Sequence, residues 1–224
     1  MTPSFLPEPL DAVIFDMDGT LLDTERLHHV AMDMAARALG HEIGDDLFAR
    51  LVGVHRDRNR LVLAEHLGAA FPLDAFYADA DRLFVERAKD GIGLRPGVVD
   101  LLDHLRANGV PCAIATSTAS PDAEQALTTA GLIGHFDVVV TRSDVANPKP
   151  APDPYLLAAQ RLGVRPAHCL AVEDSPNGIR AAAAAGMATV MVPDLLPATD
   201  ETRALTVATL ESLTGILDAL IARG

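Results

Sequence analysis

With 224 residues, of which 49% are apolar, the chain can bury a full hydrophobic core, which excludes an intrinsically disordered protein. Its formal net charge of −13 at pH 7, without a basic run, argues against nucleic acid and anionic membranes as partners. No apolar stretch is long enough to span a bilayer, and residues 1–9 lack the pattern of a signal peptide. Cys112 and Cys169 each lie in an apolar run, so we expect buried thiols in a cytoplasmic protein.

The first predicted element is a buried strand at 13–15, which leads into the turn signal Asp18-Gly19. Apolar residues at helical spacing then occupy 27–39, and further helical segments follow at 57–67 and 73–88. No strand pattern interrupts 24–91. We therefore predict a small helical domain at 24–92, inserted after the first strand.

From residue 93 onward the pattern alternates between helix and strand. The predicted elements are, in order, helix 98–105, strand 111–115, helix 121–130, strand 137–141, helix 154–162, strand 169–172, helix 176–185, strand 188–192 and helix 211–222. Asp153 and Ser175 are expected to cap the helices that follow them, and Pro121 to lie in the first turn of its helix. The predicted fold class is α/β, with a parallel-sheet, Rossmann-like core at 1–23 and 93–224 and the helical-bundle domain inserted in it.

Two carboxylates, Asp16 and Asp18, lie where the first strand ends, which is the edge at which open α/β sheets bind ligands. Close carboxylates repel each other unless a cation or a shared proton relieves them. The pair therefore predicts a metal site, a nucleophile with an acid/base partner, or both. An ordinary polar turn is the alternative that this segment alone leaves open.

The later strands also end in polar residues, and the carboxyl ends of parallel strands meet at one edge. Thr116 begins a hydroxyl-rich loop that can bind phosphate, Lys149 lies between two prolines, and Glu173-Asp174 adds two carboxylates. Taken singly, the hydroxyl loop is better explained as an ordinary polar loop, and the lysine and the carboxylates can be a surface lysine and a helix cap. Together, four carboxylates at one edge need a divalent cation, and oxygen ligands without cysteine or a histidine triad favour Mg²⁺ over zinc.

These residues, in this order, resemble the motifs of the haloacid dehalogenase-like hydrolase superfamily over nearly the whole chain, roughly residues 10–220. The motifs are Asp16-x-Asp18-Gly19-Thr20, Thr116 at the end of a strand, Lys149 and Glu173-Asp174. The inserted helical domain resembles the four-helix cap of one subclass, which includes phosphoglycolate phosphatase-like enzymes and β-phosphoglucomutase.

The resemblance implies a role for each residue of the motifs. Asp16 is the nucleophile that forms an aspartyl phosphate, and Asp18 is the general acid that then becomes the base. Thr116 and the backbone N–H of Ser117 hold the transferred phosphoryl group, and Lys149 balances its charge.

By the same resemblance, Mg²⁺ is held by Asp16, Asp174 and the carbonyl oxygen of Asp18. Glu173 either binds the metal directly or contacts the groups that bind it.

The inserted domain is expected to set the substrate. Thr24 and His28 match positions that face the catalytic acid in β-phosphoglucomutase-like proteins, and Arg56 matches an arginine that grips a second phosphate. An exposed helix residue is the alternative for His28, and a solvated arginine for Arg56. Val52 stands where the mutases have a lysine, which favours a plain phosphatase.

The leading hypothesis is a Mg²⁺-dependent phosphatase that hydrolyses a small phosphorylated metabolite, a sugar or organic monophosphate. The alternative is a β-phosphoglucomutase-like mutase with the same first half-reaction. A haloacid dehalogenase is disfavoured because Asp18 and Asp174 are present, and a catalytically silent binding protein would not need Asp18. The expected partner is the substrate alone, with the protein a monomer or a weak homodimer.

Overall fold

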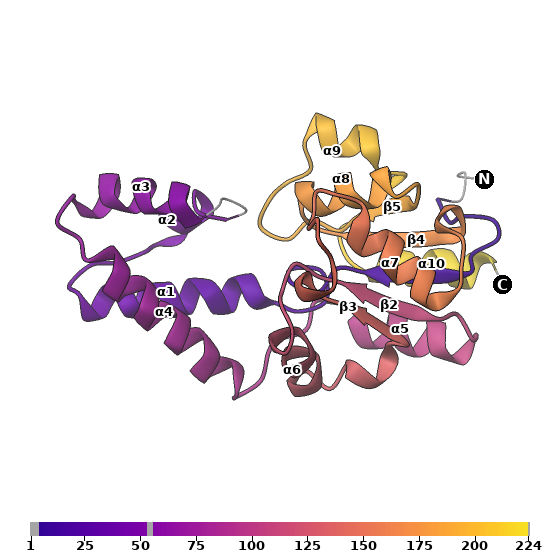
Figure 1. The fold of residues 1–224 in the computed structure, drawn as a ribbon, viewed down its shortest axis with the longest axis horizontal. Coiled ribbons are helices and arrows are strands. Elements are labelled where there is room, and N and C mark those ends of the chain that lie inside the picture. The colour runs from indigo at the N-terminus through magenta and orange to yellow at the C-terminus, as the bar shows by residue number, and fades with distance from the viewer. Residues whose placement is uncertain (1–4, 53–55, 224) are drawn as a thin grey trace. The chain divides into compact units, whose positions relative to one another are not determined.

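The computed structural model describes residues 5–52 and 56–223, and the chain divides into two compact units, Met1–Leu22 with Gly93–Gly224, and Asp23–Ile92. Within the described residues, the first unit contains a six-stranded parallel sheet in the order β3-β2-β1-β4-β5-β6 (Figure 1). The strands are β1 (Ala12–Phe15), β2 (Cys112–Ala115), β3 (Val138–Val140), β4 (Cys169–Glu173), β5 (Ala188–Met191) and β6 (Ala208–Thr209).

The strand order places β1 in the interior of the sheet, between β2 and β4. Phe15 lies opposite Ile114 on one side and Val172 on the other. From β1 the chain builds outward through β2 to β3, and it then returns to add β4, β5 and β6 on the other side. The direction of winding therefore reverses between β1 and β4, and ligands bind at the carboxyl ends of the strands at such a point.

Helices cover both faces of the sheet. Helices α7 and α8 pack on the face that carries Ile14, Ala113 and Ala171, where small alanine side chains allow close approach. Figure 1 shows α5 on the opposite side of the sheet from α8, and α5 contacts α10. The helices of this unit are α5 (Val98–Ala107), α6 (Asp122–Thr129), α7 (Asp153–Leu162), α8 (Pro176–Ala184), α9 (Asp200–Leu205) and α10 (Thr214–Arg223), with 3-10 turns η1 (Ile133–His135), η2 (Arg142–Asp144) and η3 (Pro166–His168).

The second unit is helical throughout its described residues. Its helices are α1 (Thr24–Ala38), α2 (Asp45–Ala49), α3 (Arg56–Leu67) and α4 (Leu73–Ala88). They enclose a core of their own, in which Phe48, Phe71 and Phe76 pack with Ile43 and Leu63. A separate core lets this unit hold its shape independently, whereas its role as a cap stays a prediction.

The α/β fold class is confirmed, and the structure corrects several local predictions. Asp153 lies inside α7 and Pro152 precedes it, while Pro121 precedes α6 instead of lying in its first turn. Ser175 caps α8 as predicted, because its Oγ accepts a hydrogen bond from the Gly178 N–H. The final helix begins at 214 instead of 211. None of the helices in the described residues has the length and apolar character needed to cross a membrane.

Candidate active site

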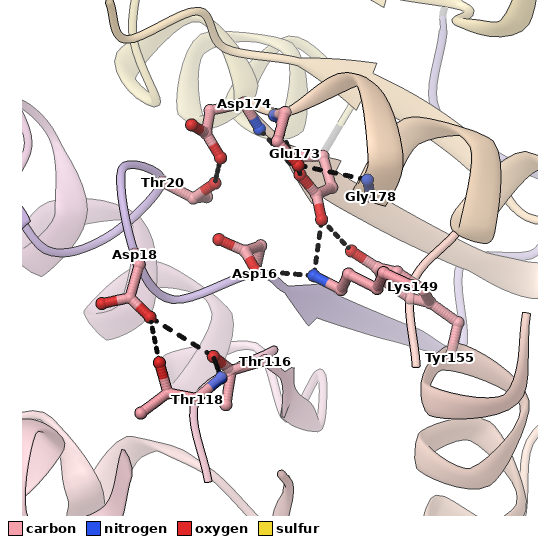
Figure 2. Close-up of polar contacts among 11 residues, drawn as sticks. Asp16, Asp18, Thr20, Thr116, Thr118, Lys149, Tyr155, Glu173, Asp174 and Gly178 are labelled. Carbon is pink, nitrogen blue, oxygen red and sulfur yellow. Dashed lines mark hydrogen bonds and ion pairs between the residues drawn. The ribbon is translucent and has the colours of Figure 1, made fainter. Parts of the chain in front are cut away.

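The predicted carboxylates and Thr116 lie at the carboxyl ends of β1, β2 and β4, and Lys149 reaches them from the segment between η2 and α7 (Figure 2). Asp16 follows β1 directly and still belongs to the ladder, because its N–H donates to the Val172 carbonyl of β4 at 2.9 Å. Thr116 follows β2 in the same way, with its N–H donating to the Val140 carbonyl of β3 at 2.9 Å. Backbone hydrogen bonds of the sheet therefore hold Asp16 and Thr116 in place independently of their side-chain contacts.

Lys149 joins the carboxylate that follows β1 to the one that ends β4. Its Nζ donates to Asp16 Oδ1 and to Glu173 Oε1, both at 2.6 Å. The three side chains are almost inaccessible to solvent, with exposures of 4% for Lys149, 9% for Asp16 and 0% for Glu173. The ammonium group also lies 5.0 Å from the centroid of the Tyr155 ring. The lysine is thus a fixed, buried counter-ion.

Glu173 is the most fully hydrogen-bonded carboxylate of the site. Within the described part of the chain, its Oε1 accepts from Lys149 and from the hydroxyl of the buried Tyr155, the latter at 2.9 Å. Its Oε2 accepts from the Asp174 N–H and from both the N–H and the hydroxyl of Ser175, at 3.0–3.1 Å. A Cβ on Gly178 would lie 1.6 Å from Oε1, so only glycine fits beneath this side chain. These donors already occupy both oxygens, which favours an organising role over direct metal binding.

Asp174 has far fewer partners than Glu173. Its Oδ1 accepts a 3.1 Å hydrogen bond from the Thr20 hydroxyl. Gly19, at φ +82°, passes close beneath it, since a Cβ at residue 19 would lie 2.5 Å from Asp174 Oδ2. One oxygen each from Asp16, Glu173 and Asp174 lies within 4.8 Å of the others, which makes this a group that can hold a metal ion. The chemistry of the donor set, oxygen only, suits a hard divalent cation.

The negatively charged groups of the site outnumber its positively charged groups. Burial raises the pKa of Asp16 to about 7, against the opposing charge of Lys149 and with added repulsion from Glu173. Burial likewise raises the pKa of Asp174, and Asp16 and Glu173 add to the rise. Burial alone would lower the pKa of Lys149, but the two carboxylates outweigh it and raise the pKa. Three carboxylates around one ammonium therefore form an acceptor site for positive charge.

Asp18 lies apart from this network. It is half-buried, and its Oδ2 accepts from the Thr118 hydroxyl at 2.7 Å and from the Thr116 hydroxyl at 3.4 Å. The Thr118 N–H in turn donates to Thr116 Oγ1 at 3.0 Å. Ser117 is exposed between them. The loop after β2 thus binds Asp18 through neutral hydroxyl groups, while the lysine binds Asp16.

Three contacts were not anticipated from the sequence. Thr118 lies within the predicted hydroxyl loop, but its bond to Asp18 depends on where the tertiary fold brings that loop. Tyr155 is in an amphipathic helix pattern that predicts only burial, and Thr20 ends the first motif without a predicted partner.

The candidate residues of the helical unit make local contacts. Thr24 is buried at the start of α1, and the ring of His28 stacks on Phe84 with centroids 3.9 Å apart. Arg56 donates to Asp81 at 2.6 Å and lies over the Tyr77 ring, 4.5 Å from its centroid. Residues 53–55, which separate Val52 from Arg56, lie outside the described residues. Substrate binding by Thr24, His28 and Arg56 stays a prediction.

The fold and this site together define an α/β enzyme with an acidic, lysine-containing centre at the reversal point of a parallel sheet. Residues 10–186 match the family model for haloacid dehalogenase-like hydrolases. The chain belongs to this hydrolase family, as its motifs predicted, and is an enzyme of the phosphohydrolase type.

Three similar proteins illustrate the relationship. Protein CbbY of Rhodobacter capsulatus is 40% identical over 195 residues, which cover 82% of this chain and 86% of that protein. The phosphorylated carbohydrates phosphatase of Thermotoga maritima is 36% identical over 182 residues, covering 80% and 82%. A HAD family hydrolase of Deinococcus radiodurans R1, solved with bound phosphate and sodium, has a TM-score of 0.82 at 28% identity, covering 96% of each chain. The similarity therefore spans both units of the chain.

Proposed function

We propose that the protein is a Mg²⁺-dependent phosphatase that hydrolyses a small phosphorylated metabolite through an aspartyl phosphate on Asp16. The observation that carries the proposal is the different environment of the two aspartates after β1. Asp16 is paired with Lys149 at 2.6 Å, whereas Asp18 is bound by the hydroxyls of Thr116 and Thr118. The Thermotoga maritima relative is named a phosphatase of phosphorylated carbohydrates, which agrees with this substrate class.

In the first half-reaction, a carboxylate oxygen of Asp16 attacks phosphorus and the bond from phosphorus to the ester oxygen breaks. Lys149 holds Oδ1 of Asp16, so we assign the attack to the other oxygen, Oδ2. Asp18 gives its proton to the departing oxygen. Asp18 then takes a proton from water, which attacks phosphorus, frees phosphate and restores the Asp16 carboxylate.

Asp16 and Asp174 are the side chains we assign to the metal, with the Asp18 carbonyl oxygen as a third protein ligand. A bound Mg²⁺ would offset the negative charge on the phosphoryl oxygens. We assign Glu173 to the lysine and the loop after β4, because its oxygens already accept from Lys149, Tyr155 and the Ser175 turn.

The proposal is tested by phosphate release from a panel of small phosphate esters, with Mg²⁺ and with EDTA. We expect Mg²⁺-dependent release by the wild type and none above background by Asp16→Asn. Asp218→Asn, at an exposed position of α10, is the matched control and should keep full activity. Activity that survives Asp16→Asn would exclude the aspartyl phosphate.

The same panel distinguishes hydrolysis from phosphoryl transfer within one substrate. It includes β-glucose 1-phosphate with a trace of the corresponding bisphosphate, and glucose 6-phosphate is measured alongside phosphate. Phosphate release without isomer supports the phosphatase. Isomer formed faster than phosphate is released would replace it with a mutase and would contradict the inference from Val52.

A further inference from the structure

The hydroxyl of Thr118 makes the shortest contact to Asp18 within the described residues (Figure 2). It donates to Asp18 Oδ2 at 2.7 Å, whereas the Thr116 hydroxyl lies at 3.4 Å, near the limit of a hydrogen bond. Lys149 donates to Asp16 and Glu173 instead. The orientation of the Asp18 side chain therefore depends mainly on Thr118.

Thr118 is itself held in place by its backbone. Its N–H donates to Thr116 Oγ1 at 3.0 Å, and its carbonyl accepts from the Arg142 N–H at 3.0 Å. Thr116 is buried and fixed to the sheet through its own N–H. Both backbone groups of Thr118 are thus anchored to elements that follow β2 and β3, and its hydroxyl is free to act as a rigid donor.

We propose that Thr118 is a positioning residue for Asp18, and this inference rests on the proposed acid/base role of Asp18. A hydroxyl that donates to Oδ2 leaves Oδ1 as the oxygen that carries the transferred proton. That proton passes from Oδ1 to the leaving oxygen in the first half-reaction and returns to Oδ1 from water in the second. Thr118 keeps its own proton throughout, because a hydroxyl can donate to Oδ2 in both the acid and the carboxylate form.

The sharpest test compares two phosphate esters whose leaving groups differ in their need for a proton. An alkyl phosphate must be protonated as it departs, whereas p-nitrophenyl phosphate has a leaving group that departs as a stable anion. The measured quantity is kcat/KM for each ester with wild type, Thr118→Val, Thr118→Ser and Asp18→Asn. Thr118→Val keeps the shape of the side chain and removes the donor.

General acid catalysis is worth roughly 10²–10⁴ in rate, and a misoriented acid keeps part of it. We expect Thr118→Val to lose about 10-fold on the alkyl ester and less than about 2-fold on p-nitrophenyl phosphate. Thr118→Ser should restore the loss, because serine provides the same donor. Thr128→Val, which removes an exposed hydroxyl that donates within α6, is the control and should change neither value.

A double-mutant cycle completes the test. In the Asp18→Asn background, Thr118→Val should cause no further loss, because the group that it positions is gone. Equal losses on both esters, or additive losses in the cycle, would overturn the role of Thr118. If Asp18→Asn itself lost activity equally on both esters, the acid role in the proposed function would fail, which is a separate result.

Discussion

Replacement of Glu173 by Gln tests whether this carboxylate organises the site or only binds metal. The substitution keeps one acceptor oxygen and turns the other into a donor. In one orientation the new amide faces Lys149 and the Tyr155 hydroxyl, and in the other it faces Asp174 N and the Ser175 donors. In either case at least two donors lose an acceptor at this side chain.

An unsatisfied buried donor costs about 1–3 kcal/mol, and breaking a buried ion pair costs roughly 3–5 kcal/mol. We therefore expect Glu173→Gln to lower the free energy of unfolding of the metal-free protein by about 3–5 kcal/mol. Asp174→Asn is the matched comparison, because Asp174 accepts from Thr20 and an amide oxygen can do the same. It also removes repulsion with Asp16, so the free energy of unfolding should stay the same or rise.

The assay is urea unfolding followed by circular dichroism, in EDTA and then in excess Mg²⁺. Mg²⁺ should stabilise the wild type, since a ligand that binds only the folded state raises its stability, and should fail to stabilise Asp174→Asn. A Glu173→Gln variant as stable as the wild type in EDTA would refute the organising role and return Glu173 to the metal ligands.

Two further predictions concern the surroundings of the site. Gly178→Ala should lower both the urea midpoint and the activity, because a Cβ 1.6 Å from Glu173 Oε1 outweighs the gain in helix propensity of about 1 kcal/mol. Gly134→Ala, where a Cβ meets open space, is its control and should change the midpoint little. For Asp144, burial raises the pKa, but hydrogen bonds from Arg161 and Thr141 outweigh it and lower the pKa from 3.8 to about 2. Because the pKa of Asp144 is lower in the folded protein, its carboxylate stabilises the fold above about pH 4, and this stabilisation is lost as the pH falls through about 2. Asp144→Asn should therefore lower the urea midpoint at pH 7, by an amount that shrinks towards about pH 2.

The sheet was predictable because its strands are short apolar runs bounded by strong turn signals. Parallel strands share one carboxyl edge, so the polar residues after β1, β2 and β4 could be placed together before their contacts were known. Elements of a few residues were not predictable in this way. Helix α2, helix α9 and strand β6 are too short for a periodic pattern to identify them.

The hydrogen-bond partners of the side chains in the site could not be predicted from the sequence either. Burial of Tyr155 follows from its helix pattern, but its hydrogen bond to Glu173 depends on how α7 lies against β4. The bond between Thr118 and Asp18 likewise joins residues 100 positions apart. Such contacts are set by tertiary packing, and spacing in the sequence carries no signal for them.

The roles proposed for the two aspartates agree with the different partners that the fold gives them, independently of the family. Burial raises the pKa of Asp16, and the ammonium group of Lys149 opposes that rise, so Lys149 favours the charged form that the proposed nucleophile requires. A carboxyl bound by neutral hydroxyls can gain and lose a proton without breaking those bonds, which an acid that later becomes a base requires. The two-residue spacing produces this difference, because Asp16 is still within the sheet while Asp18 lies beyond it, next to the loop that follows β2. The two side chains are chemically identical, so the proposed difference in their roles comes from their partners: the ammonium group of Lys149 for Asp16, and hydroxyl groups for Asp18.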